Sequence, residues 1–322
     1  MIKQLLKVFF AGIIIYWLLS KGHLDFALIG QSLHHPWHWL LCLTLIVFNF
    51  LMTSWRWKVL LEIKTPHALP FARITALTWI GMFFSTVLPG AVTGDVIKLV
   101  YARDLNPHLT RSYLLTSILL DRLLGMFGLL MVMGIFSLIS YRQLIEFGPD
   151  MQNLLRLNFF LFAAMLICFS TIFIPAKGQN FLLAMVKRIP KLGEKIVHLL
   201  EQFWFIGQAK KAVFICTMMS GISQLGNVFA FWILTLPFYS VDVPFQYAIS
   251  FIPIGLISVA IPISPSGLGV GHAMFAALFS LVGMKEGASL FNLFFLATLF
   301  INLLGVLPYL LIKKHQPQPI EE

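Results

Sequence analysis

The 322 residues are 59% hydrophobic and only 11% charged, with a mean hydropathy of +0.87. A soluble fold of this length needs more polar surface, so the composition predicts an integral membrane protein and excludes a soluble enzyme. The net charge of +10 does not indicate nucleic acid, because the 23 Lys and Arg are scattered over short segments between apolar runs. Membrane topology and anionic lipid explain this charge better.

Apolar segments long enough to cross a bilayer, which takes about 20 helical residues, recur along the chain. The alternating pattern of a membrane barrel does not occur. We therefore predict an all-α, polytopic transmembrane helix bundle that forms a single integral membrane domain over residues 1–322. The six predicted full crossings are 5–20, 39–60, 112–139, 157–175, 212–237 and 287–312.

The first of these segments has the basic flank and apolar core of a signal peptide. It lacks a small-residue cleavage site and is followed by many further spans. We therefore expect the segment to be retained as the first helix.

Two further apolar segments, about 71–101 and 244–284, contain helix breakers near their middles. The first holds PGAVTGD at 89–95 and the second holds PISPSGLGVG at 262–271. Proline removes a backbone donor and glycine weakens a helix, so neither segment is expected to be one continuous helix. We predict two broken or re-entrant helical hairpins, with two full crossings as the alternative for 244–284.

The distribution of Lys and Arg predicts the orientation in a bacterial cytoplasmic membrane. Residues 176–211 carry seven Lys or Arg against two Glu, which is 7 − 2 = +5, so this amphipathic connector is expected in the cytoplasm. The loop at 238–243 holds only Asp242 and is expected outside. Both termini are then cytoplasmic, and the two hairpins enter from opposite faces, as in transporters with inverted repeats.

The break at 89–98 contains the first group of candidate site residues, in which Pro89 and Gly90 interrupt the helix. A helix restarting after Gly94 would point free N–H groups into the break, which suits an anionic group. Asp95 is either the cap of that helix or a residue that couples transport to a proton or cation. Lys98, one turn further on, is close enough to pair with Asp95 or with a phosphate.

The second break contains glycines and hydroxyls followed by a histidine. Its GLGVG lacks the Lys that follows a phosphate-binding loop and the strand that precedes a dinucleotide-binding turn. Gly267 and Gly269 instead let the backbone turn within the membrane, and Ser264 and Ser266 offer hydroxyl groups. His272 is either a satisfied structural residue or a ligand and proton-relay residue.

Two further pairs of candidate residues lie within predicted crossings. Asp121 and Arg122 are adjacent, so their side chains diverge by roughly 100° and are not expected to pair with each other. Arg122 is predicted either to bind a lipid phosphate or to pair with Asp95. Arg56 and Trp57 are interpreted as a snorkelling cation and part of an interfacial aromatic belt, with phosphate contact as the alternative.

No cofactor or metal site is predicted. Cys42, Cys168 and Cys216 lie far apart in apolar segments without metal-ligand spacing, so we interpret them as packing residues. Amides within the crossings, such as Gln224 and Asn302, are expected to join helices.

The ordered motifs RW at 56–57, PG…GD at 89–95, DRLLG at 121–125 and PISPSGLGVG at 262–271 resemble a known family. It is the flippase-like membrane family that includes the lysylphosphatidylglycerol synthase transmembrane region, and the resemblance spans roughly residues 5–312. It implies movement of a lipid or lipid-linked headgroup. The family motifs fall on Arg56, Pro89, Gly90, Gly94, Asp95, Arg122, Ser264, Gly267 and Gly269. The family often has Glu where this chain has His272 and commonly has Glu where it has Asp121.

The sequence is best interpreted as a transporter or flippase that moves an anionic phospholipid or a polyprenyl-phosphate-linked lipid without converting it. The expected partner is the membrane lipid itself, together with a second copy of the chain or an envelope biosynthesis protein. A membrane-embedded transferase acting on a lipid-linked donor is the enzymatic alternative. The non-catalytic alternative is a scaffold for envelope lipid enzymes.

Overall fold

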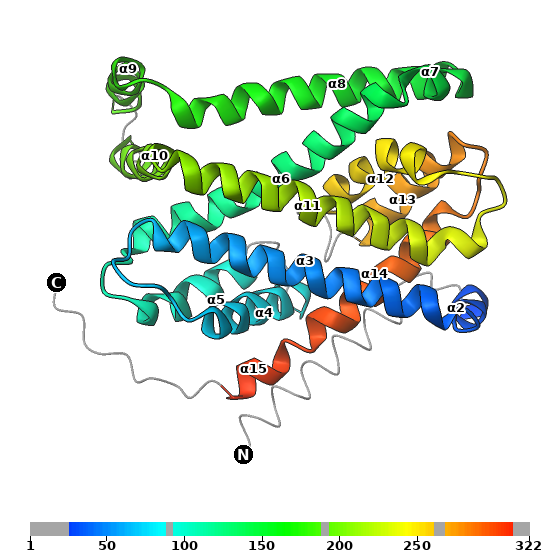
Figure 1. The fold of residues 1–322 in the computed structure, drawn as a ribbon, viewed down its shortest axis with the longest axis horizontal. Coiled ribbons are helices and arrows are strands. Elements are labelled where there is room, and N and C mark those ends of the chain that lie inside the picture. Colours follow the sequence, from blue (N-terminus) through cyan, green and yellow to red (C-terminus); the bar gives the residue numbers. More distant parts are fainter. Residues whose placement is uncertain (1–25, 88–92, 188–192, 261–267, 312–322) are drawn as a thin grey trace.

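A computed structural model describes residues 26–87, 93–187, 193–260 and 268–311 (Figure 1). Within these ranges the chain is helical and contains no β-strand, which confirms the predicted all-α class. The predicted crossing at 5–20 lies outside the described residues. The α-helices are α2 (Phe26–Ser32), α3 (Pro36–Glu62), α4 (Phe71–Val87), α5 (Thr93–Ala102), α6 (Arg111–Ile139), α7 (Tyr141–Leu144), α8 (Pro149–Ser170), α9 (Ala176–Val186), α10 (Gly193–Gln208), α11 (Lys210–Thr235), α12 (Phe245–Ala260), α13 (Leu268–Ser280), α14 (Gly287–Leu303) and α15 (Val306–Leu311). Short 3₁₀ turns extend several of these helices: η1 (Arg103–Leu105), η2 (Ile145–Phe147), η3 (Thr171–Phe173) and η4 (Leu236–Phe238).

Five helical segments among the described residues are long and apolar enough to cross a membrane. Each has at least 25 residues and is therefore about 38 Å long or longer, compared with a hydrocarbon core of about 30 Å. They confirm five of the six predicted crossings. Their bounds are Pro36–Glu62, Arg111–Ile139, Pro149–Phe173, Lys210–Phe238 and Gly287–Leu311.

The first broken segment forms the hairpin of α4 and α5, which lie side by side (Figure 1). The ten residues of α5 span only about 15 Å, half the thickness of the hydrocarbon core. The chain therefore enters along α4 and returns along α5 to the same end of the bundle. This confirms the predicted re-entrant hairpin.

The second broken segment forms the hairpin of α12 and α13, which enters from the opposite end of the bundle (Figure 1). These helices have 16 and 13 residues, so neither reaches the length of a full crossing. A Cβ atom at Gly255 would overlap with the ring of Phe275, so the two helices touch where Gly255 has no side chain. The geometry favours a hairpin over two full crossings.

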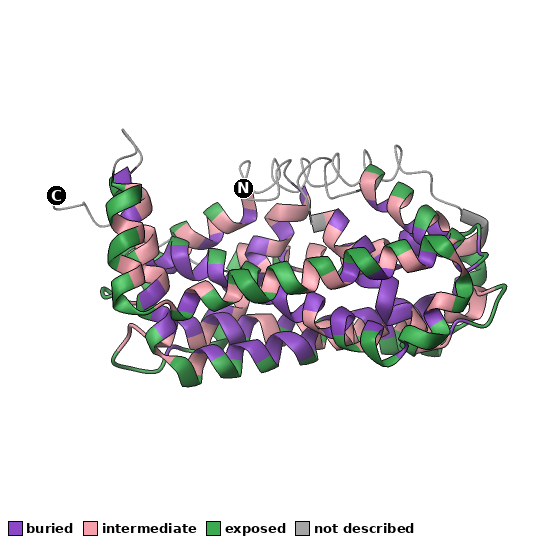
Figure 2. Ribbon diagram, turned by 90° about the horizontal axis from the view of Figure 1, so that it is seen from above, coloured by how far each residue is buried: buried purple, intermediate pink, exposed green. Residues whose placement is uncertain are grey.

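The core of the bundle is aromatic. Phe231 of α11 stacks on Phe275 of α13 with ring centroids 4.8 Å apart, and Phe275 stacks on Phe291 of α14 at 5.1 Å. Figure 2 shows buried residues on the inward faces of the helices and exposed residues on the outward faces. The outward faces are also apolar: Phe160, Ile167 and Phe214 are 69%, 70% and 63% exposed. Such a surface suits acyl chains rather than water.

The two ends of the bundle carry opposite charge. One end collects the end of α3, the start of α4, the turn after α5, the start of α6, α9, α10 and the start of α11 (Figure 1). We call it the basic end, because its described charged residues include Lys64, Arg73, Arg103, Arg111, Lys177, Lys187, Lys210 and Lys211. The other end holds mainly carboxylates, namely Glu146, Asp150, Asp242 and Glu286.

Candidate functional site

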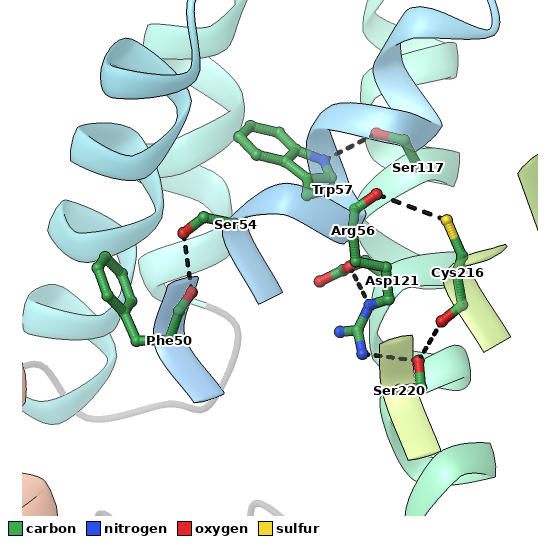
Figure 3. Close-up of polar contacts among 8 residues, drawn as sticks. All are labelled: Phe50, Ser54, Arg56, Trp57, Ser117, Asp121, Cys216 and Ser220. Carbon is green, nitrogen blue, oxygen red and sulfur yellow. Dashed lines mark hydrogen bonds and ion pairs between the residues drawn. The ribbon is translucent and has the colours of Figure 1, made fainter. Parts of the chain in front are cut away.

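A buried ion pair between α3 and α6 lies at the centre of the candidate site (Figure 3). Arg56 Nε donates to Asp121 Oδ1 at 2.7 Å, and the two side chains are only 5% and 9% exposed. The prediction that Arg56 snorkels and Trp57 joins an interfacial belt was wrong, because Trp57 is fully buried. A charge inside an apolar bundle must find a countercharge, and Asp121 supplies it.

A third helix, α11, contributes a hydrogen-bond partner to Arg56. Arg56 Nη1 donates to Ser220 Oγ of α11 at 2.9 Å, and Ser220 Oγ donates to the Cys216 carbonyl at 2.8 Å (Figure 3). Glycines permit the crossing: a Cβ at Gly128 would overlap with Ser220, and one at Gly125 would touch the Arg56 guanidinium. Sequence reasoning missed Ser220, because a serine beside a glycine in an apolar helix resembles an ordinary packing position.

A second ion pair joins α5 and α6. Arg122 Nε contacts Asp95 Oδ2 at 2.5 Å. Arg122 turns toward α5 while the neighbouring Asp121 turns toward α3, as their helical offset predicts. The predicted pairing of Arg122 with Asp95 is thus observed. This pair is more open than the first, with side chains 42% and 22% exposed.

Lys98 lies one turn after Asp95 on α5 and is only 5% exposed. Its Nζ sits 3.7 Å from the centroid of the Trp57 ring, and Trp57 Nε1 donates to Ser117 Oγ at 3.2 Å. Among the described residues Lys98 forms no ion pair. The expected pairing of Lys98 with Asp95 is therefore not observed, and a cation–π contact takes its place.

The prediction for Gly94 needs correction. It was expected to precede the restarted helix, but α5 begins at Thr93 and Gly94 is helical. A Cβ at Gly94 would overlap with the Gly81 carbonyl oxygen and with Ser85 Oγ of α4. The glycine therefore allows the two arms of the hairpin to touch. Pro89 and Gly90 lie outside the described residues.

The second break contributes a separate polar pair. His272 Nε2 contacts Asn292 Oδ1 of α14 at 2.5 Å, and the His272 ring meets Phe291 edge-on. Gly269 is exposed on α13, and a Cβ added to it would meet no atom within 4 Å. The structure thus brings Arg56, Asp121, Asp95, Arg122 and Lys98 together, while His272 belongs to a different pair. Ser264, Ser266 and Gly267 lie outside the described residues.

Helix α14 links the two hairpins. Asn302 Nδ2 donates to Thr86 Oγ1 of α4 at 3.1 Å, and Trp79 Nε1 of α4 donates to the Ile301 carbonyl at 2.8 Å. These contacts confirm that Asn302 joins helices, as expected for an amide in a crossing. Helix α14, whose Asn292 contacts His272 of the second hairpin, is therefore also bonded to the first hairpin.

Comparison with known proteins gives one match. A family model described as the lysylphosphatidylglycerol synthase TM region matches residues 4–305, nearly the whole chain. Searches of curated proteins and of solved structures returned no match. The matched range includes the motifs at 56–57, 89–95, 121–125 and 262–271. This chain is a multi-pass membrane protein that belongs to the lysylphosphatidylglycerol synthase TM region family.

Proposed function

We propose that this protein moves a lipid with a phosphate-containing, anionic headgroup across a bacterial cytoplasmic membrane. The headgroup binds beside the cluster formed by Arg56, Asp95, Lys98, Asp121 and Arg122. Membership of the family and the two opposed hairpins support this function, since interrupted helices that enter from opposite faces form the sites of many transporters. The proposed activity is movement, with no bond made or broken.

The charge of the cluster carries the proposal. Three cations, Arg56, Lys98 and Arg122, lie with two carboxylates, Asp95 and Asp121, which leaves 3 − 2 = +1. The two arginines are paired, so the excess positive charge belongs to the buried ammonium of Lys98. An unpaired ammonium is unfavourable in an apolar interior, and a phosphate oxygen would compensate it.

Arg122 provides the accessible side of the same cluster. Its side chain is 42% exposed, compared with 5% for Arg56. A planar guanidinium binds phosphate with two parallel hydrogen bonds. The headgroup phosphate can therefore replace the Asp95 carboxylate as the partner of Arg122. Arg56 is enclosed by Asp121 and Ser220, and its role is to fix the wall of the site.

The orientation follows from charge. The basic end of the bundle carries the described Lys and Arg of the connectors, and such residues favour the cytoplasmic side. We place this end, the 176–211 connector and both termini in the cytoplasm. The α4–α5 hairpin then opens from the cytoplasm and the α12–α13 hairpin from the outside.

The test is lipid movement by the purified protein in liposomes, followed with a fluorescent phosphatidylglycerol and an impermeant quencher. We expect the wild-type protein to move lipid faster than protein-free liposomes do. Lys98→Gln should move lipid at least about tenfold more slowly, because a tenfold change in rate corresponds to about 1.4 kcal/mol, which the loss of one charged contact with the phosphate should exceed. Lys285→Gln, at the opposite end of the bundle, is the matched control and should move lipid at the wild-type rate.

Three results would overturn the proposal: no movement above background, wild-type movement by Lys98→Gln, or equal movement of a fluorescent phosphatidylcholine. A radiolabelled lipid-linked donor incubated with the same liposomes tests the enzymatic alternative. Conversion of that donor to a new product would replace transport with a transferase activity.

A further inference from the structure

A groove at the basic end lies apart from the charged cluster. It has a volume of about 560 Å³ and runs between the end of α8, helix α10 and the start of α11. Its apolar lining includes Phe169, Ile172, Phe173, Trp204 and Phe214. In Figure 1, α8 lies apart from α11 at this end, and α10 is seen end-on beside the start of α11.

The floor of the groove is fixed. Trp204 of α10 is 4% exposed, and its Nε1 donates to the Thr171 carbonyl at 3.1 Å. A Cβ at Gly207 would overlap with the Ile172 carbonyl, so α10 and the turn after α8 are in direct contact. The rim is open by contrast, because Phe173 and Phe214 are 43% and 63% exposed. The groove is therefore a built feature with an apolar opening toward the surface that faces acyl chains.

One end of the groove is polar and basic. Lys210 lines it together with Gln179 and Gln208. A second hollow of about 370 Å³ shares both glutamines with the first and is lined by Lys64. Lys64 Nζ lies 3.4 Å from Gln202 Oε1, so its ammonium is held beside this hollow.

The charge around the groove selects its occupant. Lys177, Lys187 and Lys211 are exposed on or directly beside the helices that border it. The exposed carboxylates of α10 are Glu194 and Glu201, and Glu201 lines the second hollow and lies 3.4 Å from His198. Basic side chains beside an apolar, membrane-facing groove match a phosphate headgroup and an acyl chain. A free phosphate would use only the basic part and leave the apolar lining unused.

We infer that the groove binds one acidic phospholipid of the leaflet at the basic end. The headgroup phosphate lies against Lys210 and Lys64, and one acyl chain lies on Phe169, Phe173 and Phe214. This site is independent of the proposed transport: its lipid is resident and stands outside the charged cluster. Thr217 also lines the groove, one helical turn before Ser220, which holds Arg56. A bound lipid therefore stabilises the part of α11 that supports the cluster.

The experiment uses the full chain, purified and stripped of lipid by prolonged detergent washing. Phosphatidylglycerol, phosphatidylcholine and glycerol phosphate are added back, and binding is followed by native mass spectrometry and thermal unfolding. We expect tight binding of phosphatidylglycerol only. Lys64→Gln/Lys210→Gln should weaken it roughly fivefold for each lysine removed. Arg142→Gln/Lys285→Gln, at the opposite end, is the matched control and should bind like the wild type.

Two further variants separate this site from the charged cluster. Phe173→Ala/Phe214→Ala should weaken phosphatidylglycerol binding with both lysines intact. In Lys98→Gln, the phosphatidylglycerol binding that remains should still be weakened by Lys64→Gln/Lys210→Gln. Circular dichroism checks that each variant is folded. Equal binding of phosphatidylcholine, equal binding of glycerol phosphate, or wild-type binding by both double variants would each overturn the inference. Loss of binding in Lys98→Gln alone would assign the lipid to the transport cluster instead.

Discussion

Arg56 of α3 and Asp121 of α6 form an ion pair across 65 positions of the chain, with 2.7 Å between Nε and Oδ1. Ser220 of α11 binds the same guanidinium, so three crossings meet at one side chain. A buried charge tolerates few alternative partners, and the pair therefore fixes how these helices are rotated toward one another. The neighbouring pair of Asp95 and Arg122 is more exposed, which divides the cluster into a structural part and an accessible part.

Asp121→Asn keeps the size of the side chain but leaves the Arg56 charge uncompensated. We expect the free energy of unfolding to fall by about 3–5 kcal/mol. The measurement is unfolding in mixed micelles with increasing denaturing detergent, followed by circular dichroism. Glu201→Gln, in the exposed pair with His198, is the control and should cost less than about 1 kcal/mol. Wild-type stability of Asp121→Asn would contradict a structural role for the pair.

The loss of thermal stability on replacing a glycine with alanine should depend on the space available for the new methyl group. Gly94→Ala places a Cβ on the Gly81 carbonyl and Ser85 Oγ, so we expect the largest loss of thermal stability there. Gly81→Ala should cost less, since its Cβ would lie 3.2 Å from the Gly94 carbonyl oxygen. Gly269→Ala meets nothing within 4 Å and is the control, expected to be neutral or slightly stabilising because alanine favours helix. Equal melting temperatures for all three would show that α4 and α5 do not pack closely.

Variants of Arg122 should separate transport from stability. Arg122→Lys keeps the charge but loses the planar fork, so we expect it to retain part of the lipid movement, and Arg122→Ala to retain less. Because this pair is partly exposed, Asp95→Asn should destabilise the protein less than Asp121→Asn does. Lipid movement and thermal stability are measured on the same preparations. Full transport by Arg122→Ala at wild-type stability would remove this residue from the proposed site.

The proposed orientation predicts which positions react with an impermeant thiol reagent. The native Cys42, Cys168 and Cys216 are first replaced by alanine. In intact cells, Asp242→Cys should be labelled and Lys187→Cys should not, while both should be labelled after the membrane is permeabilised. Labelling of Lys187→Cys alone in intact cells would invert the orientation.

The helices and the two hairpins could be predicted from the sequence because the signals are local. An apolar run of more than 20 residues crosses a bilayer whatever its neighbours, and a Pro-Gly cluster interrupts a helix wherever it occurs. The crossings from 39–60 onward and the two interrupted segments were predicted in this way, and the distribution of Lys and Arg then predicted that each interrupted segment is a hairpin. The same local reasoning identified Asp95, Asp121 and Arg122 as ionisable residues that need a partner inside the membrane.

The partners themselves depend on tertiary structure. Nothing near Arg56 in the chain indicates that it is buried, because its position close to the end of a crossing equally suits a side chain that reaches the interface. Burial follows from the crossing of α3, α6 and α11, where Gly128 lets α6 approach Ser220 of α11 and Ser220 accepts a hydrogen bond from Arg56. The sequence predicted that Gly94 belongs to a helix break, because glycine weakens a helix. In the structure Gly94 is helical, and its missing side chain lets α5 pack against α4. Helix formation is decided along the chain, but the face that each helix turns inward is decided by the other helices.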